Sequence, residues 1–259
     1  MADDNKSINA YVLIILIIYF LFFINWAGAS DWPIFKKDAS NSGITADRVP
    51  DDPVILWSAD IQRMETTPIV SSGLIYALTG NGSVYAVGLQ TGDLIWQSQL
   101  EGWVFQMSSL ASSGEEIFAA TDSGLLAAFD AKTGQMLWKM YRTDKRCESH
   151  LNCIDGRLYL GEGSAYGTGK KRFFCFSEDG EECWNVSTIT KGYQWCGACA
   201  DGDYLVFGQN DGILFSVDRS SGEVVDELNL SDSTRLSFFQ EKPGRVRASA
   251  AFRDGYVYA

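Results

Sequence analysis

Six cysteines and a single histidine are the residues of this sequence whose side chains could do the most selective chemistry. They lie in one stretch of the chain, as Cys147, His150, Cys153, Cys175, Cys183, Cys196 and Cys199. Thiolates bind metals and iron–sulfur clusters, and an even number of cysteines is typical of disulfides in an exported chain. A catalytic triad would have to use His150, and no Gly-x-Ser-x-Gly motif accompanies it. We therefore expect His150 to be a loop or strand-edge residue.

Cys175 and Cys183 flank a short hairpin, and their spacing predicts a disulfide. If residues 178–180 form a three-residue loop, Ser177 faces Glu181 and Cys175 faces Cys183. Directly opposed residues of antiparallel strands have Cα atoms about 4.5–5.5 Å apart, which is within the range that a disulfide tolerates. We predict that these two cysteines are paired.

The other four cysteines leave three pairings open. Cys153 and Cys199 occupy the same position in successive repeats, and Cys196-Gly-Ala-Cys199 has the spacing of a redox or metal motif. A redox Cys-x-x-Cys normally lies at a helix N-terminus, and no helix is expected here. We therefore favour structural disulfides, with a metal or iron–sulfur site built from Cys147, Cys153, Cys196 and Cys199 as the alternative. We predict no catalytic, cofactor-binding or metal-binding residue.

The elements that carry these cysteines belong to a repeat. Similar segments cover residues 82–96, 124–138, 172–184 and 212–226, and a half-copy ends at Trp57. Their last residues, Trp57, Trp96, Trp138, Trp184 and Asp226, are separated by 39, 42, 46 and 42 residues. A period near forty residues indicates a repeat architecture.

Each copy has the pattern of a β-hairpin. An apolar run reaches a short turn, and a second run ends at the tryptophan; the turn glycines are Gly92, Gly134, Gly180 and Gly222. Glycine supplies the positive φ that such turns need. Another pair of apolar runs precedes each hairpin, so the period contains four strands. This predicts an all-β fold, a β-propeller of four-stranded antiparallel blades with WD40-like architecture, whose repeat tryptophans are buried between neighbouring blades.

The repeat resembles the pyrroloquinoline-quinone-like (PQQ-like) propeller family. The resemblance rests on an aliphatic-Tyr pair, an aliphatic-Tyr-Ala run, a Thr-Gly turn and a closing Trp, and it covers residues 31–259. The lead-in Asp31-Trp-Pro-Ile-Phe35, with Asp38 and Gly43, is similar to that of many members. The family contains quinoprotein dehydrogenases and non-enzymatic scaffolds, such as the lipoprotein subunit of the outer-membrane β-barrel assembly machinery.

For an enzyme of that family, the resemblance implies a tryptophan floor, two adjacent cysteines, a calcium ion and an aspartate base. This sequence contains no Cys-Cys pair. We therefore predict that the chain binds no cofactor, with PQQ and calcium as the alternative.

The N-terminus has the pattern of an export segment. Residues 11–24 are uncharged and mostly large and apolar, and Ala27-Gly-Ala29 fits a signal-peptide cleavage site. We predict a cleaved signal peptide or, as the alternative, a transmembrane anchor at residues 8–27. Both place the rest of the chain outside the cytoplasm, secreted or anchored to a membrane. Asn81, Asn185 and Asn229 begin sequons that only a glycosylating host would use.

The charge balance narrows the class of partner. The formal net charge is −12, from 33 acidic and 21 basic residues. Acidic surfaces repel phosphate backbones, which argues against nucleic acid. We predict a non-enzymatic extracytoplasmic binding or scaffold module that presents loops to a protein or polysaccharide at the cell surface. A quinone-dependent dehydrogenase and the extracellular sensor domain of a larger protein are the alternatives.

The predicted domains are an export segment at residues 1–29, a lead-in and closing strand at 30–58, and blades at 59–259. These blades are four complete ones and a partial fifth, because residues 254–259 match residues 72–77. The strand at Trp57 is expected to close the ring by completing the last blade, whose third strand does not follow in this sequence. We therefore expect an open ring, with further blades encoded downstream.

Overall fold

The computed structural model describes residues 30–259, apart from residues 65, 105–109, 143–145, 164–168, 191, 231–245 and 247. The chain divides into two compact units, residues 1–30 and 31–259, and the strands belong to the second. The predicted export segment at residues 1–29 lies outside the described residues. Within the described part of the chain, no helix is both long enough and apolar enough to cross a membrane.

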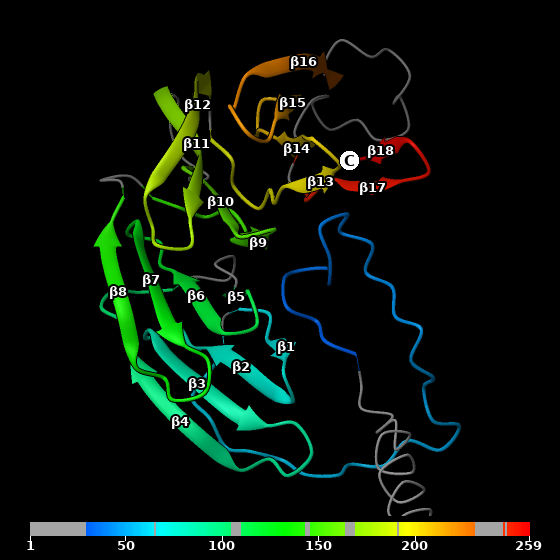
Figure 1. Cartoon of the computed structure of the whole chain (residues 1–259), viewed down its shortest axis with the longest axis vertical. Coiled ribbons are helices and arrows are strands. Elements are labelled where there is room, and N and C mark those ends of the chain that lie inside the picture. Colours follow the sequence, from blue (N-terminus) through cyan, green and yellow to red (C-terminus); the bar gives the residue numbers. More distant parts are fainter. Residues whose placement is uncertain are drawn as a thin grey trace, which may run out of the picture. The chain divides into compact units, whose positions relative to one another are not determined.

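Four sheets of four antiparallel strands follow one another along the chain, and in each sheet the strands lie in chain order (Figure 1). The first sheet contains β1 (Ile69–Ser71), β2 (Leu74–Leu78), β3 (Ser83–Gly88) and β4 (Leu94–Gln99). The second contains β5 (Leu110–Ser112), β6 (Glu116–Ala120), β7 (Leu125–Asp130) and β8 (Met136–Tyr141). The third contains β9 (Asn152–Ile154), β10 (Arg157–Gly161), β11 (Gly169–Ser177) and β12 (Glu182–Thr190). The fourth contains β13 (Cys199–Asp201), β14 (Tyr204–Gly208), β15 (Ile213–Asp218) and β16 (Val224–Asn229). These sheets are propeller blades, which confirms the predicted all-β fold.

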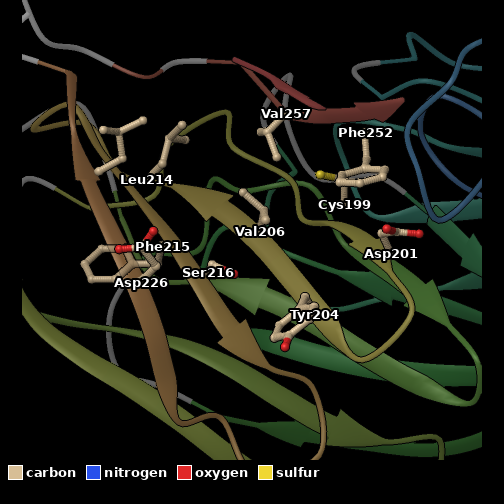
Figure 2. A pocket seen from close by; sticks show the side chains of 11 residues that line it. Cys199, Asp201, Tyr204, Val206, Leu214, Phe215, Ser216, Asp226, Phe252 and Val257 are labelled. Atoms are coloured by element: carbon tan, nitrogen blue, oxygen red, sulfur yellow. The ribbon is translucent and has the colours of Figure 1, made fainter. Parts of the chain in front are cut away.

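A pair of strands, β17 (Ala251–Arg253) and β18 (Tyr256–Tyr258), follows the fourth blade. Its turn has the backbone of the first turn of a blade: Asp254 and Gly255 have φ of 51° and 80°, and Ser72 and Gly73 have φ of 53° and 77°. The pair therefore has the geometry of the first two strands of a fifth blade, as the repeat predicts. A cavity separates part of this pair from the fourth blade (Figure 2).

Every four-stranded blade has a β-bulge at the same place between its third and fourth strands. In the first blade, Ala86 pairs with Trp96 and Val87 pairs with Leu94, so Ile95 is the extra residue. The extra residues of the later blades are Leu137, Cys183 and Val225. Because a bulge increases local twist, its repetition gives each outer hairpin the same curvature.

Each repeat tryptophan contacts the turn of the next hairpin along the chain. The indole Nε1 atoms of Trp57, Trp96, Trp138 and Trp184 donate hydrogen bonds of 2.9 Å to the carbonyl oxygens of Leu89, Ala131, Glu178 and Arg219. Trp96 and Trp184 are buried, whereas Trp57 and Trp138 are partly buried. A Cβ atom added at Gly92, Gly134 or Gly222 would lie within 2.7 Å of the facing indole, so these glycines allow the ring to lie directly on the turn.

The predicted closing strand at residues 30–58 is not a strand in the structure. Trp57 lies in an irregular segment, although its indole contacts the first hairpin as the other repeat tryptophans contact theirs. The neighbouring Val54, Ile55 and Leu56 are 72%, 89% and 74% exposed. A strand needs a ladder partner for its backbone N–H and C=O groups. The described residues offer no such partner to this segment, so it stays irregular.

The lead-in instead runs along the first strands of the blades. Residues 32–40 form backbone hydrogen bonds with β1, β5, β13 and β17, through the pairs Trp32–Val70, Pro33–Ser112, Ala39–Ala200 and Ser40–Phe252 at 2.7–3.0 Å. The Asn41 Nδ2 atom donates to the carbonyl oxygens of Ala198 at 3.0 Å and Ala250 at 2.7 Å. The lead-in therefore forms hydrogen bonds with backbone groups at strand edges, which have no partner within their own blade.

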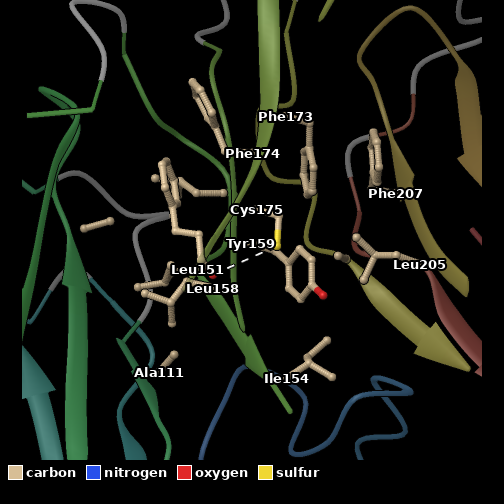
Figure 3. Close-up of a cluster of buried hydrophobic side chains, with 14 of the residues drawn as sticks. Ala111, Leu151, Ile154, Leu158, Tyr159, Phe173, Phe174, Cys175, Leu205 and Phe207 are labelled. Atoms are coloured by element: carbon tan, nitrogen blue, oxygen red, sulfur yellow. Dashed lines mark hydrogen bonds between the residues drawn. The ribbon is translucent and has the colours of Figure 1, made fainter. Parts of the chain in front are cut away.

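Aromatic side chains fill the space between the third and fourth blades (Figure 3). Phe173 on β11 stacks on Phe207 on β14, with ring centroids 3.8 Å apart and an interplanar angle of 4°. Both rings are fully buried, as is Tyr159 on β10. Stacked aromatic pairs add about 0.5–1.5 kcal/mol to the stabilisation that burial provides. The blades are thus held to each other by side-chain packing rather than by shared ladder hydrogen bonds.

Candidate partner-binding surface

The hairpin of Cys175 and Cys183 differs from the predicted register. Cys175 pairs with Trp184, and Cys183 is the extra residue of the bulge. The prediction that Cys175 directly faces Cys183 was wrong by one residue, because it did not include the bulge. Burial raises the pKa of Cys175 to about 12, the hydrogen bond from Arg157 opposes this, and neighbouring Cys183 raises it further. The two side chains are therefore neighbours, and their disulfide stays a prediction.

The remaining cysteines are in buried or partly buried positions. Burial raises the pKa values of Cys153, Cys196 and Cys199 to about 12 and also raises that of Cys147. A redox-active thiol needs the opposite shift, so burial disfavours the thiolate form of Cys196 and Cys199. In the part of the chain that the structure describes, no group of three or more His, Cys, Asp and Glu side chains could hold a metal ion. The alternative four-cysteine metal site is therefore not assembled.

His150 is packed inside the protein. Its ring stacks on Phe35 of the lead-in, with centroids 3.9 Å apart and planes inclined by 6°, and the residue is 8% exposed. Burial, with a smaller contribution from the charge of Lys36, lowers the pKa of His150 to about 4. The neutral imidazole is thus a packing group at neutral pH, and it lies in the irregular segment before β9, consistent with the predicted loop residue.

The loops at one end of the blades are joined by a regular series of backbone hydrogen bonds. Within a blade, the N–H of a residue after the fourth strand donates to the turn between the second and third strands, in the pairs Val104–Gly80, Cys147–Asp122 and Tyr193–Glu162. Between blades, a backbone N–H in the corresponding turn of the following blade donates to the carbonyl oxygen of the residue just before Val104, Cys147 or Tyr193. These pairs are Asp122–Trp103, Gly163–Arg146 and Asn210–Gly192. These bonds are 2.7–3.4 Å long and link the loops of four blades. We call this set of loops the loop chain.

Consecutive residues of the loop chain point in opposite directions, one into the protein and the other toward solvent. Val104, Cys147 and Tyr193 are buried, with exposed fractions of 2%, 0% and 0%. The residues before the first two of these point outward: Trp103 is 72% exposed and the Arg146 side chain is 54% exposed. The backbone bonds therefore hold an exposed indole and an exposed guanidinium on a preorganised frame.

A buried polar network supports the Arg146 side of this frame. Arg146 Nη1 lies 3.0 Å from Glu148 Oε1, and Gln194 Nε2 donates to Glu148 Oε2 at 2.7 Å. The backbone N–H of Trp195 donates to the Glu148 carbonyl at 2.8 Å, and Trp195 adopts an unusual φ of 64°. Glu148 is 8% exposed, so it holds the guanidinium from the interior of the protein. The other side of Arg146 stays open to solvent.

A cavity of about 460 Å³ opens between these loops, lined by Gly102, Trp103, Asp122, Ser123 and Arg146. Its walls offer an aromatic face, a cation, a carboxylate and a hydroxyl, which suit recognition of another protein. Sequence analysis missed Trp103 and Arg146, because neither occupies a repeat position. The signal that could have found Trp103 is a tryptophan placed between two repeats, where blade packing does not require one.

Comparison with known proteins identifies the type of repeat. The family model of the outer membrane protein assembly factor BamB matches residues 50–194 and 80–259. BamB of Yersinia pestis is 28% identical over 227 residues, which cover 80% of this chain and 54% of that protein. BamB of Kangiella koreensis is 27% identical over 177 residues, which cover 65% and 43%. This chain spans about half the length of these curated relatives.

A solved structure of a dehydrogenase has a similar fold. The quinohemoprotein alcohol dehydrogenase from Comamonas testosteroni superposes with a TM-score of 0.69 at 15% identity, over 89% of this chain and 46% of that one. At this identity the likeness concerns the fold alone. The matches of the family model together span residues 50–259, most of the chain. The chain therefore belongs to the BamB family of PQQ-like β-propellers.

Proposed function

We propose that this chain is a non-enzymatic scaffold of the cell envelope that binds a protein partner through the Trp103–Arg146 surface of the loop chain. The observation that carries the proposal is the hydrogen-bonded frame that presents these two side chains beside a cavity. Tryptophan and arginine are the residue types most enriched at binding hot spots, and rigid presentation lowers the entropy lost on binding. The relatives named as outer membrane protein assembly factors support a protein partner outside the cytoplasm. They give no support to a polysaccharide partner.

The residues present do not fit the quinone cofactor that the enzymes of this fold imply. The indole N–H groups of the repeat tryptophans bond to carbonyls of neighbouring turns, so these residues serve blade packing. The sequence has no adjacent cysteines. Among the described residues, no cluster of acidic side chains is placed to hold a calcium ion. We therefore propose no redox step for this chain.

The partner test compares variants of the surface with a control on the same blade. The immobilised chain is titrated with purified outer-membrane assembly proteins of the native host. Trp103→Ala is expected to weaken the complex about 30-fold, since a hot-spot side chain contributes about 2 kcal/mol or more. Arg146→Ala is expected to act in the same direction. Leu94→Ala removes a residue that is 56% exposed at the far end of β4, and it should leave affinity unchanged.

Two outcomes would contradict the proposal. One is a complex that Trp103→Ala and Arg146→Ala weaken less than threefold. The other is micromolar binding of PQQ with calcium, measured by calorimetry, together with dye-linked oxidation of alcohols. The second outcome would favour the dehydrogenase.

A further inference from the structure

Two arginines lie between the third and fourth blades, at positions where the earlier blades have other residues. One position begins the second strand of a blade, and the other carries the carbonyl that accepts the repeat indole. These positions hold Leu74 and Ala131 between the first two blades, Glu116 and Glu178 between the second and third, and Arg157 and Arg219 between the third and fourth. Blade packing therefore does not require arginine at either position.

The two arginines differ in their partners. Arg219 Nη2 lies 2.8 Å from Asp155 Oδ2, in an ion pair between the blades, and Arg219 Nη1 donates to the Gly202 carbonyl oxygen at 2.8 Å. Arg157 Nη1 lies 3.3 Å from the Arg219 carbonyl oxygen and 3.9 Å from Cys175 Sγ. Within the described part of the chain, no carboxylate forms an ion pair with Arg157. Because a guanidinium has five N–H donors, Arg157 keeps donors for a ligand.

A cavity of about 450 Å³ opens beside these arginines, and Asp155, Arg157, Asp203, Asp218, Arg219 and Ser220 line it. Cavities that hold small ligands have volumes of about 300–1,000 Å³. Both blades that form this cavity have all four strands. Its lining belongs to the turns that precede β10, β14 and β16, which lie at the end of the blades opposite the loop chain (Figure 1).

The walls of the cavity carry opposite charges. Arg157 belongs to the third blade, whereas Asp203 and Asp218 belong to the fourth. A side-chain hydrogen bond from Ser220, followed by a backbone bond from Ser221, lowers the pKa of Asp218 to about 2, so this carboxylate is ionised at neutral pH. Since Asp155 and Arg219 neutralise each other, a simple anion would meet two carboxylates and a simple cation would meet Arg157. A ligand that carries both charges is complementary to both walls.

We propose that this cavity binds a small zwitterion, an α-amino acid, with its carboxylate on Arg157 and its ammonium group on Asp203 and Asp218. Arginine pairs with carboxylates through two parallel N–H donors, which fixes the orientation of the ligand. The ammonium group then faces the fourth blade. This site is separate from the loop chain, and it does not depend on the function proposed for Trp103 and Arg146.

The ligand class is tested on the whole chain with L-alanine and two derivatives that each lack one charge. Saturation-transfer NMR titration should show saturable binding of L-alanine, with a Kd of roughly 0.1–1 mM. N-acetyl-L-alanine lacks the ammonium group and L-alaninamide lacks the carboxylate, so each should bind at least tenfold more weakly. Binding of either derivative as tight as that of L-alanine would overturn the two-charge assignment. Tighter binding of inorganic phosphate, or no saturable binding of L-alanine up to about 10 mM, would overturn the ligand class.

Two variants remove the charges from opposite walls. Arg157→Gln and Asp203→Asn should each weaken L-alanine binding at least fivefold. Arg48→Gln and Asp93→Asn are the matched controls: both residues are exposed and neither lines the cavity, so affinity should be unchanged. Circular dichroism checks that each variant folds. Wild-type affinity in a folded Arg157→Gln or Asp203→Asn variant would overturn the site.

Discussion

The indole Nε1 of Trp96 donates a 2.9 Å hydrogen bond to the carbonyl oxygen of Ala131 in the next blade. The same ring lies on the turn that follows, where a Cβ atom at Gly134 would be 2.5 Å from its Cδ2 and Cε3 atoms. One tryptophan therefore uses its edge for a directional bond and its face for close packing. Because Trp138 and Trp184 form the same bond, each of the first three blades is fixed to the hairpin turn of its successor.

Trp96→Ala should destabilise the protein strongly. Trp96 is 8% exposed, and removing a large buried ring costs about 3–5 kcal/mol in the free energy of unfolding. Trp103→Ala is the control, because Trp103 is 72% exposed and should cost less than about 0.5 kcal/mol. Urea unfolding of the three proteins measures both values. A cost below about 1 kcal/mol at Trp96 would contradict the assigned role.

Gly134→Ala should be more destabilising than Gly73→Ala. Both glycines have similar positive φ, 70° and 77°, so alanine is conformationally strained to a similar extent at either site. A methyl group at Gly134 would also collide with the Trp96 indole, whereas at Gly73 nothing lies within 4 Å. The difference in urea midpoint therefore isolates the collision. Equal costs at the two sites would show that the indole can shift without loss.

The number of strands and their turns could be predicted from the sequence, because both depend on local chemistry. The glycines of the turns have the positive φ that the repeat pattern requires, and alternating apolar runs form the strands between them. The bulge has no such local signal. It increases the local twist of the outer hairpin. Its extra residue is the reason that Cys175 pairs with Trp184 and not with Cys183.

The loop chain could not be predicted for a different reason. The loop chain is made of backbone hydrogen bonds between segments far apart in sequence, such as that from Gly163 to Arg146 and that from Asn210 to Gly192. Backbone hydrogen bonds do not involve side chains, so they leave no pattern of residue types in the sequence. The sequence at Trp57 matches a fourth strand, but the described residues offer this segment no ladder partner, in line with the absence of a third strand expected from the repeat.

Cys175 and Cys183 should form a disulfide when the protein is made in an oxidising compartment. Their side chains are neighbours at the bulge, although the residues are not directly paired. The bond would close a short loop, so its stabilisation should be near the low end of the usual range, about 2 kcal/mol. Non-reducing peptide mapping of protein secreted from its host checks the pairing. A link from either residue to another cysteine, or two free thiols, would contradict it.

His150 should make stability depend on pH in the acidic range. Its pKa is lowered from 6.5 to about 4 in the folded state, by burial and then by Lys36. Between these values the unfolded chain binds a proton that the folded protein does not. Stability should therefore fall as pH drops from about 6.5 to about 4, by roughly 3 kcal/mol in total.

The variant His150→Phe tests this titration, because phenylalanine keeps a ring for the stack on Phe35 and cannot be protonated. Unfolding free energies of both proteins are measured between pH 4 and pH 7. The difference between wild type and variant should change across this window, since titrating carboxylates contribute equally to both. A constant difference would show that His150 does not titrate as its burial requires.

Asn41 should be essential for the attachment of the lead-in. It is 2% exposed, and its Nδ2 atom donates to buried carbonyl oxygens of Ala198 and Ala250, before β13 and β17. Asn41→Ala would leave both oxygens without this donor, at about 1–3 kcal/mol each, and would place alanine at a φ of 55° that favours asparagine. Asn41→Asp should be worse, because a carboxylate would face two carbonyl oxygens. Asn185→Ala, which removes an exposed amide bonded to Glu182, is the control and should cost less than about 1 kcal/mol. If Asn41→Ala unfolds at the same urea concentration as Asn185→Ala, the lead-in does not hold the first strands of these blades together.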